Sequence, residues 1–217
     1  MAKTKPKPAL SRERIVDAAI ELLDRGGEDG LTFRTLAEQL ATGAGAIYWH
    51  VANKHELLVA ASDAIVARAL AGVAAHGAPR KAIRAIAVAV FDVVDAHPWL
   101  GAQLARGPWQ TATLQIFERI GRQLQALRVP DGAQFTAASA LMSYILGVSE
   151  QNAANSRAFA PGADRAAVLA AEAARWQALD AAEYPFARRI AAQLRAHDDR
   201  AEFLAGVDLV LAGIAAA

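Results

Sequence analysis

Hydrophobic positions near the start of the chain recur every three or four residues, which is typical of an amphipathic helix. Ser11 is suited to cap such a helix, and Gly26-Gly27 is expected to end it. We expect the helix to pack across the next segment of the chain and to support it. Its apolar face would consist of Ile15, Ala18, Ala19, Leu22 and Leu23.

Residues 31–58 contain two shorter helical patterns, a break and a new helix start. Thr32 is placed to cap the first helix, residues 41–43 form the break, and the second helix is expected over residues 44–50. The side chains that would be buried are Leu36, Ala37, Leu40, Ile47 and Val51. The large polar-tipped side chains that would remain outside are Tyr48, Trp49 and His50. This arrangement predicts a helix-turn-helix DNA-binding motif.

Helical periodicity continues through the rest of the chain, and clear strand alternation is hard to find. Asn53 with Glu56 resembles a capping box, which predicts a long helix from Lys54 toward residue 77 that links two domains. The pattern predicts an all-α protein with a basic arm, a three-helix DNA-binding domain and a larger helical domain, over residues 1–10, 11–57 and 58–217. Further helices are expected over about residues 80–96, 99–106, 109–127, 133–155, 164–179, 185–197 and 200–215.

The composition fits a small helical domain joined to a larger one, because 54% of the 217 residues are hydrophobic. The absence of cysteine excludes a disulfide framework and a thiolate metal site. The sequence has no apolar signal segment and no uncharged run of 18 apolar residues. We therefore expect a soluble, cytoplasmic protein with no membrane partner.

The net charge of +1 is unevenly distributed. Residues 1–14 carry one acidic residue, Glu13, and several basic ones. A basic arm of this kind can lie along a DNA phosphate backbone, although a disordered, solubilising tail is the alternative for its first residues. The basic residues of the arm and the first helix turn are Lys3, Lys5, Lys7, Arg12 and Arg14.

Residues 45–51, Gly-Ala-Ile-Tyr-Trp-His-Val, and residues 53–58, Asn-Lys-His-Glu-Leu-Leu, resemble the recognition helix and connecting helix of TetR-family transcriptional repressors. Tyr-Trp-His-Val points to the branch similar to the tetracycline repressor. The resemblance covers about residues 11–65 strongly and weakens beyond, where residues 97–100 and 203–213 are similar to the family's regulatory domain. It implies a homodimer that binds a near-palindromic double-stranded DNA operator and releases it when a small-molecule effector binds.

The resemblance also implies roles for individual residues in the DNA-binding domain. Arg34 matches a base-contacting arginine whose guanidinium fits guanine O6 and N7. Tyr48 matches a residue that can hydrogen-bond a phosphate, and His50 lies where the family contacts the DNA backbone or a base. Residues 43–46 are small where relatives often carry polar base readers, so Arg34, His50 and DNA shape are expected to carry more of the specificity. Tyr48 and Trp49 have core packing as an alternative role. The expected DNA-binding residues are Thr32, Arg34, Thr42, Ala44, Gly45, Ala46, Tyr48, Trp49, His50 and Lys54.

The helices between residues 80 and 155 carry large aromatic side chains and a few amides, a combination typical of a ligand pocket. Such a pocket favours a flat, mainly apolar effector, for instance an aromatic drug or a polyketide-like metabolite. Plain core packing is the alternative for each residue. No cofactor or obligatory metal is expected, because no spacing around His76 and His97 identifies a ligand set. The candidate ligand-binding residues are Phe91, His97, Trp99, Gln103, Trp109, Gln110, Gln115, Phe117, Met142, Tyr144 and Asn152.

The last helix carries an apolar stripe. The family resemblance implies that this stripe forms a dimer interface together with the helix over residues 133–155. The alternative is that the stripe closes the hydrophobic core of its own chain. The stripe consists of Phe203, Leu204, Val207, Leu211 and Ile214. A sequestering protein with degenerate DNA specificity is a second possible function, motivated by residues 43–46. An enzyme is not expected, because no nucleophile, base and orienting group form a recognisable pattern.

Overall fold

A computed structural model describes residues 10–73, 77–106, 110–158 and 164–216. Within these ranges all regular structure is helical, as the sequence predicts. No helix in them is both long and apolar enough to span a membrane. The elements are α1 (Arg12–Gly30), α2 (Phe33–Leu40), α3 (Ala44–Tyr48), α4 (Lys54–Ala71), α5 (Pro79–Ala96), α6 (Trp99–Arg106), α7 (Thr111–Ala126), α8 (Asp131–Ala158), α9 (Arg165–Gln177), α10 (Pro185–Ile190), the 3-10 helix η1 (Ala191–Ala196) and α11 (Asp199–Ala216).

Helix α1 begins where its cap predicts and ends later than expected. The Ser11 hydroxyl accepts a hydrogen bond from the Arg14 backbone N–H at 3.3 Å. Gly27 adopts the non-helical angles φ 61° and ψ −161°, which interrupt the helix at the predicted position, and a further short helical turn runs from there to Gly30. The predicted break at Gly26-Gly27 is therefore confirmed, whereas the turn after it was not expected, and that turn carries Glu28 toward the larger domain.

Helices α2 and α3 form the predicted helix-turn-helix. Ala41 closes α2 in the left-handed conformation, with φ 48° and ψ 54°. Ile47 and Val51 are buried in one hydrophobic core that also includes residues of α1, α2 and α4, as the pattern predicts. Helix α3 has five residues and ends at Tyr48, two residues before the expected end. Because α3 is so short, packing rather than intrinsic helix stability holds it in place.

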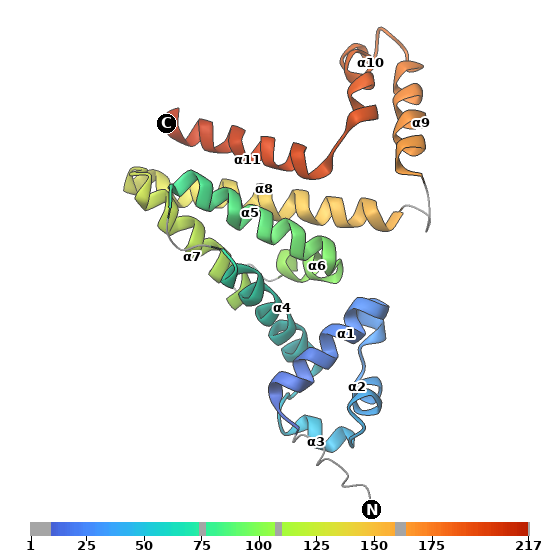
Figure 1. Cartoon of the computed structure of the whole chain (residues 1–217), viewed down its shortest axis with the longest axis vertical. Helices are drawn as coiled ribbons and strands as arrows, with labels where there is room; N and C mark the ends of the chain where they lie inside the picture. Colours follow the sequence, from blue (N-terminus) through green and yellow to red (C-terminus); the bar gives the residue numbers. More distant parts are fainter. Residues whose placement is uncertain (1–9, 74–76, 107–109, 159–163, 217) are drawn as a thin grey trace, which may run out of the picture.

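Helix α4 joins the two parts of the molecule (Figure 1). The Asn53 side chain accepts from the Glu56 N–H at 2.9 Å, and a Glu56 carboxylate oxygen accepts from the Ala52 N–H at 2.9 Å. Along its length α4 packs on α1, then on α5, α6 and α7. It ends at Ala71, short of the expected residue 77. Because it begins at Lys54, α4 crosses the predicted domain boundary between residues 57 and 58 and belongs to both domains.

In the larger domain, α5 and α7 pack on α8, and α11 covers α5 and α8 (Figure 1). The helix expected over 185–197 divides into α10 and η1 at Ala191. Helices α9, α10 and η1 pack mainly on one another and stand away from the rest of the chain in Figure 1. The hydrophobic core runs from Ile15 to Leu211 through both domains.

Candidate DNA-binding surface and ligand pocket

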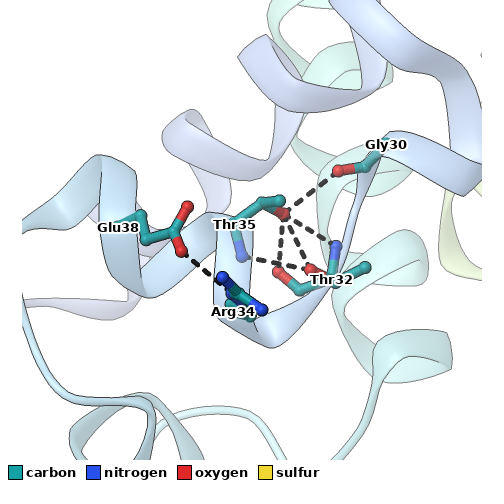
Figure 2. Close-up of polar contacts among 5 residues, drawn as sticks. All are labelled: Gly30, Thr32, Arg34, Thr35 and Glu38. Carbon is teal, nitrogen blue, oxygen red and sulfur yellow. Dashed lines mark hydrogen bonds and ion pairs between the residues drawn. The ribbon is translucent and has the colours of Figure 1, made fainter.

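The first turn of α2 is held by a reciprocal cap (Figure 2). The Thr32 hydroxyl accepts from the Thr35 N–H, and the Thr35 hydroxyl oxygen accepts from the Thr32 N–H, each at 3.0 Å. Thr35 Oγ1 also lies 3.1 Å from the Gly30 carbonyl oxygen. These contacts satisfy backbone groups that a helix start leaves unpaired and fix the direction of α2.

Arg34 projects into solvent from this rigid turn. Its side chain is 88% exposed, and its Nε donates to Glu38 Oε1 at 3.0 Å across one helical turn. Figure 2 shows the two side chains together on one side of α2. Sequence reasoning singled out Arg34 and missed Glu38, although the four-residue spacing is typical of a helical ion pair.

Tyr48 and Trp49 are both on the surface, 55% and 89% exposed, so neither fills the core of the small domain. The Tyr48 ring stacks on Phe33 at the start of α2, with centroids 4.4 Å apart and planes 3° apart. This contact holds the Tyr48 ring against α2 and leaves α3 with a large exposed aromatic group at its end.

The turn and the first residues of α3 expose backbone rather than polar side chains. Thr42, Ala44 and Ala46 are partly exposed and Gly45 is exposed. A Cβ atom added at Gly43 or Gly45 would meet no atom within 4 Å. The backbone of α3 is thus free to approach a groove closely.

His50 and Lys54 lie at the ends of the connection between α3 and α4. His50 lies close enough to Glu13 to contribute to that carboxyl's lowered pKa, although hydrogen bonds from the Glu13 backbone and Ser11 are larger causes. The Lys54 ammonium donates to the Glu28 carbonyl oxygen. Lys54 therefore points toward the end of α1, unlike the other expected DNA-binding residues.

A polar contact joins the DNA-binding domain to α6. Asp24 Oδ1 accepts from Trp99 Nε1 at 2.8 Å and lies 2.7 Å from His97 Nδ1. One turn further along α1, Glu28 Oε1 accepts from Gln103 Nε2 at 2.6 Å and from Arg106 Nη1 at 2.7 Å. His97, Trp99 and Gln103 were expected in the ligand pocket, but their partners lie on α1.

An apolar cavity of about 380 Å³ opens between α6, α7 and α8. Its polar groups are hydroxyls, and none of its described lining side chains is charged. Phe117 and Met142 were among the candidates, whereas Phe135, Ser139 and Ser143 were missed. Their spacing of four residues along α8 is the signal that could have identified them. The lining residues are Leu104, Ala105, Thr113, Leu114, Phe117, Phe135, Ser139, Met142, Ser143 and Leu146.

Other pocket candidates lie elsewhere. Phe91 is buried and stacks on Phe203 with centroids 4.7 Å apart, and Tyr144 donates to the Phe203 carbonyl oxygen at 3.1 Å. Burial and then the charge of Glu202 raise the pKa of Tyr144. Asn152 donates to Asp95 at 3.0 Å. None of these three side chains lines the apolar cavity.

Three more residues were expected in the ligand pocket: Trp109, Gln110 and Gln115. Gln110 has a buried Oε1 atom with no hydrogen-bond partner in the described ranges, and Gln115 is half-buried on α7 without lining the apolar cavity. Trp109 lies outside the described residues, as do Lys3, Lys5, Lys7 and His76. Among the described residues, no group of three or more His, Asp or Glu side chains is arranged to hold a metal ion.

The apolar stripe of α11 divides into two parts. Phe203, Val207 and Leu211 are buried against α5 and α8, so these three side chains close the chain's own core. Leu204 and Ile214 remain partly exposed. The opposite side of α11 carries Leu209, which is 75% exposed and was not among the expected interface residues.

Asp63 connects α4 to the beginning of α7. Burial raises the pKa of its carboxyl, while the Ala112 backbone N–H and the Thr111 side chain oppose the shift. Asp63 Oδ1 is buried without a hydrogen-bond partner in the part of the chain that the structure describes. The ionised carboxylate is therefore poorly solvated, even though it lies at a helix start that favours negative charge.

Comparison with known proteins identifies both domains. Residues 15–61 match the family described as bacterial regulatory proteins, tetR family, and residues 75–217 match the tetracyclin repressor-like C-terminal domain. An HTH-type transcriptional regulator of Saccharopolyspora erythraea is 32% identical over 146 residues, which are 67% of this chain and 62% of that protein. The class D tetracycline repressor from Escherichia coli is 51% identical over 59 residues, 27% of each protein. The matches thus span less than two thirds of both relatives.

Solved structures share the fold over nearly the whole chain. The transcriptional regulator SCO7222, a TetR from Streptomyces coelicolor, is 55% identical with a TM-score of 0.87, covering 96% of this chain and 99% of that one. ActR from the same organism, in complex with actinorhodin, is 22% identical with a TM-score of 0.77, covering 96% and 98%, which shows a common fold alone. The chain belongs to the TetR family of bacterial regulatory proteins.

Proposed function

We propose that this protein is a ligand-responsive transcriptional repressor, which binds a near-palindromic operator as a homodimer and is released by a small, mainly apolar or aromatic effector. The observation that carries the proposal is the physical link between two sites. Helix α6 lines the apolar cavity with Leu104 and Ala105, and its Gln103 and Arg106 bind Glu28 of the DNA-binding domain. A ligand that moves α6 would therefore move α1.

The effector is a neutral, flat molecule with a few polar groups. The described lining of the cavity is apolar apart from the hydroxyls of Thr113, Ser139 and Ser143. A charged ligand would lose its hydration there without gaining a partner of opposite charge, which is unfavourable. Hydroxyl groups one turn apart on α8 suit a ligand that carries carbonyl or hydroxyl oxygens.

The dimer would form through the outer sides of α8 and α11. Leu209 is exposed on α11, and Ile214 lines an apolar groove of about 270 Å³ between the two helices. Gly147 is exposed on α8, where it leaves room for a second helix. The two helix-turn-helix motifs of such a dimer, here called its reading heads, would be related by a twofold axis. They would then fit operator half-sites roughly 34–36 Å apart.

The first test is a titration of labelled DNA from upstream of the gene with the wild type and Tyr48→Ala, at two salt concentrations. Tyr48 is exposed at the end of α3. We expect sequence-dependent wild-type binding that Tyr48→Ala weakens about tenfold, since a base or phosphate contact is lost. Tyr184→Ala, which truncates an exposed tyrosine before α10, is the matched control and should bind as the wild type does.

If the wild type binds no upstream fragment at either salt concentration, the repressor proposal fails. In the same assay, anthraquinone and flavone would test neutral planar effectors, with anthraquinone-2-sulfonate as the charged comparison. Release of DNA by the sulfonate and by neither neutral compound would contradict the proposed ligand class.

A sequestering protein is the second candidate, favoured by the open, side-chain-poor stretch from Gly43 to Ala46. It would bind a ligand tightly but bind all DNA sequences weakly and about equally. Equal affinity for upstream and scrambled duplexes, falling steeply with salt, would support this function over repression.

A further inference from the structure

Arg34 and Glu38 form an exposed pair whose geometry leaves part of the arginine free. Glu38 Oε1 accepts from Nε of Arg34 at 3.0 Å, and in the described ranges no other hydrogen bond engages the two terminal nitrogens. Glu38 thus contacts the Nε side of the guanidinium and not its two terminal nitrogens. Figure 2 shows the contact between the two side chains. The terminal nitrogens therefore remain available as a pair of donors.

The two terminal nitrogens of Arg34 match the acceptor pair on the major-groove edge of guanine. Guanine presents O6 and N7 side by side in the major groove, and an arginine fork binds both at once. Without a partner on Nε, the long Arg34 side chain would sample many rotamers and bind any nearby phosphate equally well. The Thr32–Thr35 cap fixes the backbone from which Arg34 extends, so Glu38 is the remaining constraint on its direction.

Stability does not account for the pair. The two side chains are 88% and 63% exposed, and an ion pair this open contributes little to folding in water. A carboxylate on a surface that faces DNA also repels phosphate. It therefore lowers affinity for all sequences and is favourable only where Arg34 gains a specific partner.

We infer that Glu38 is a positioning residue for sequence recognition: it directs the Arg34 guanidinium toward a guanine and penalises non-specific binding. The inference rests on the proposed function, in which Arg34 reads a base. The other residues expected to contact DNA are hydrogen-bond donors or small residues, whereas Glu38 would act through its negative charge. The inference also assigns part of the sequence specificity to α2, because α3 begins with small residues.

The experiment compares the wild type, Glu38→Gln, Arg34→Ala and the double variant on two duplexes. One is the upstream duplex bound by the wild type, and the other is its scrambled sequence. Glu38→Gln should bind scrambled DNA roughly three- to tenfold more tightly and lower the operator-to-scrambled affinity ratio about tenfold, because it removes one repulsive charge and replaces the ion pair on Arg34 Nε with a weaker neutral hydrogen bond. Arg34→Ala should lower the same ratio, and Glu38→Gln should change it little further in that background.

A guanine-specific readout separates positioning from a general charge effect. Guanines of the operator are replaced one at a time by 7-deazaguanine, which lacks the N7 acceptor. For wild-type protein one replacement should weaken binding about five- to tenfold; this sensitivity should be reduced in Glu38→Gln, which holds Arg34 less tightly, and should disappear in Arg34→Ala. Circular dichroism melts check that every variant is folded.

The chain offers a matched control on α7. Glu118 accepts from Nε of Arg122 at 2.7 Å, with side chains 58% and 70% exposed and the same four-residue spacing. Glu118→Gln removes the same charge far from the reading head. It should leave the affinity ratio and the guanine sensitivity unchanged.

Three results would overturn the inference. The first is a Glu38→Gln affinity ratio equal to that of the wild type, and the second is an equal change in Glu118→Gln. The third is full 7-deazaguanine sensitivity in Glu38→Gln, which would show that Arg34 reaches its base unaided. If wild-type protein binds operator and scrambled DNA with equal affinity, the proposed function itself fails. The wild-type measurement alone shows this, so the two failures can be told apart.

Discussion

Asp63 provides a pH-dependent contact between α4 and the start of α7. Burial raises its pKa above the ordinary value of 3.8, so the folded state binds this proton more tightly than the unfolded state does. Protonation of Asp63 therefore stabilises the fold. That contribution is fully present below pH 3.8 and is lost as the pH rises through the raised pKa.

Asp63→Asn removes this titration while keeping an oxygen that can accept from the Ala112 N–H. We expect the wild type to gain unfolding free energy relative to the variant as pH falls from 7 toward 3.8. Urea unfolding followed by circular dichroism at several pH values measures the difference, in which the titration of other groups largely cancels. A difference that stays constant over this range would contradict the assigned pKa direction.

The packing of α8 on α11 depends on a glycine. A Cβ atom at Gly206 would overlap the hydroxyl and ring of Tyr144, which is also held by its hydrogen bond to the Phe203 carbonyl and by stacking on the Phe203 ring. Because the rigid ring can move only by disturbing these contacts, a side chain at 206 would force the two helices apart.

Gly206→Ala should therefore destabilise the protein by roughly 1–3 kcal/mol, despite the better helix propensity of alanine. Thermal unfolding followed by circular dichroism provides the measurement. Gly121→Ala on α7 is the control, because a Cβ atom there would meet nothing within 4 Å. It should leave stability unchanged or raise it by up to about 1 kcal/mol. Equal melting temperatures for the two variants would contradict the prediction and would show that the Tyr144 side chain can move aside at little cost in stability.

Coupling across the whole molecule depends on how α6 is tied to α1. Glu28 receives two donors from α6 and carries the Lys54 ammonium on its carbonyl, so it joins α1, α4 and α6. In the proposed mechanism, a movement of α6 at the cavity would therefore be passed to α1 and α4, the two helices that pack beside the helix-turn-helix. The proposed release of DNA requires this connection, because the effector cavity and the exposed surface of α3 have no common residue.

Glu28→Gln replaces the charged acceptor with a neutral one and should loosen this connection. We expect the affinity for an effector to stay within about twofold, while the concentration needed to release DNA rises severalfold, since typical allosteric coupling is about 1–3 kcal/mol. Calorimetry and the DNA titration measure the two quantities. Glu118→Gln again serves as the control, and a parallel rise in both quantities for Glu28→Gln would indicate damage to the cavity instead of lost coupling.

Residues close together in the sequence were enough to predict the reading head. The caps at Ser11, Thr32 and Asn53 and the buried pair Ile47 and Val51 act within one or two helical turns, so periodicity and capping chemistry identify them. The family resemblance rests on the same local segment. The break at Gly27 was predicted, but the helical turn after it was not, because whether a helix resumes beyond a glycine depends on the residues that follow.

Partners far apart in the sequence decided the rest. His97, Trp99 and Gln103 have the composition of a pocket, but their hydrogen-bond acceptors are Asp24 and Glu28, more than 70 residues away. In the same way, an apolar stripe on α11 fits either a dimer interface or a core until the positions of α5 and α8 are known.

Amphipathic patterns and caps by themselves determined that the chain is all-α, where the reading head lies and which side chains α3 exposes, because these features depend on local hydrogen bonding and on the helical repeat. Only the tertiary structure decided which face of α6 meets α1, which face of α11 is buried and where the apolar cavity opens. Those features depend on the packing of helices distant in the sequence, and a helix with apolar residues on more than one side can pack in several ways until its neighbours are in place.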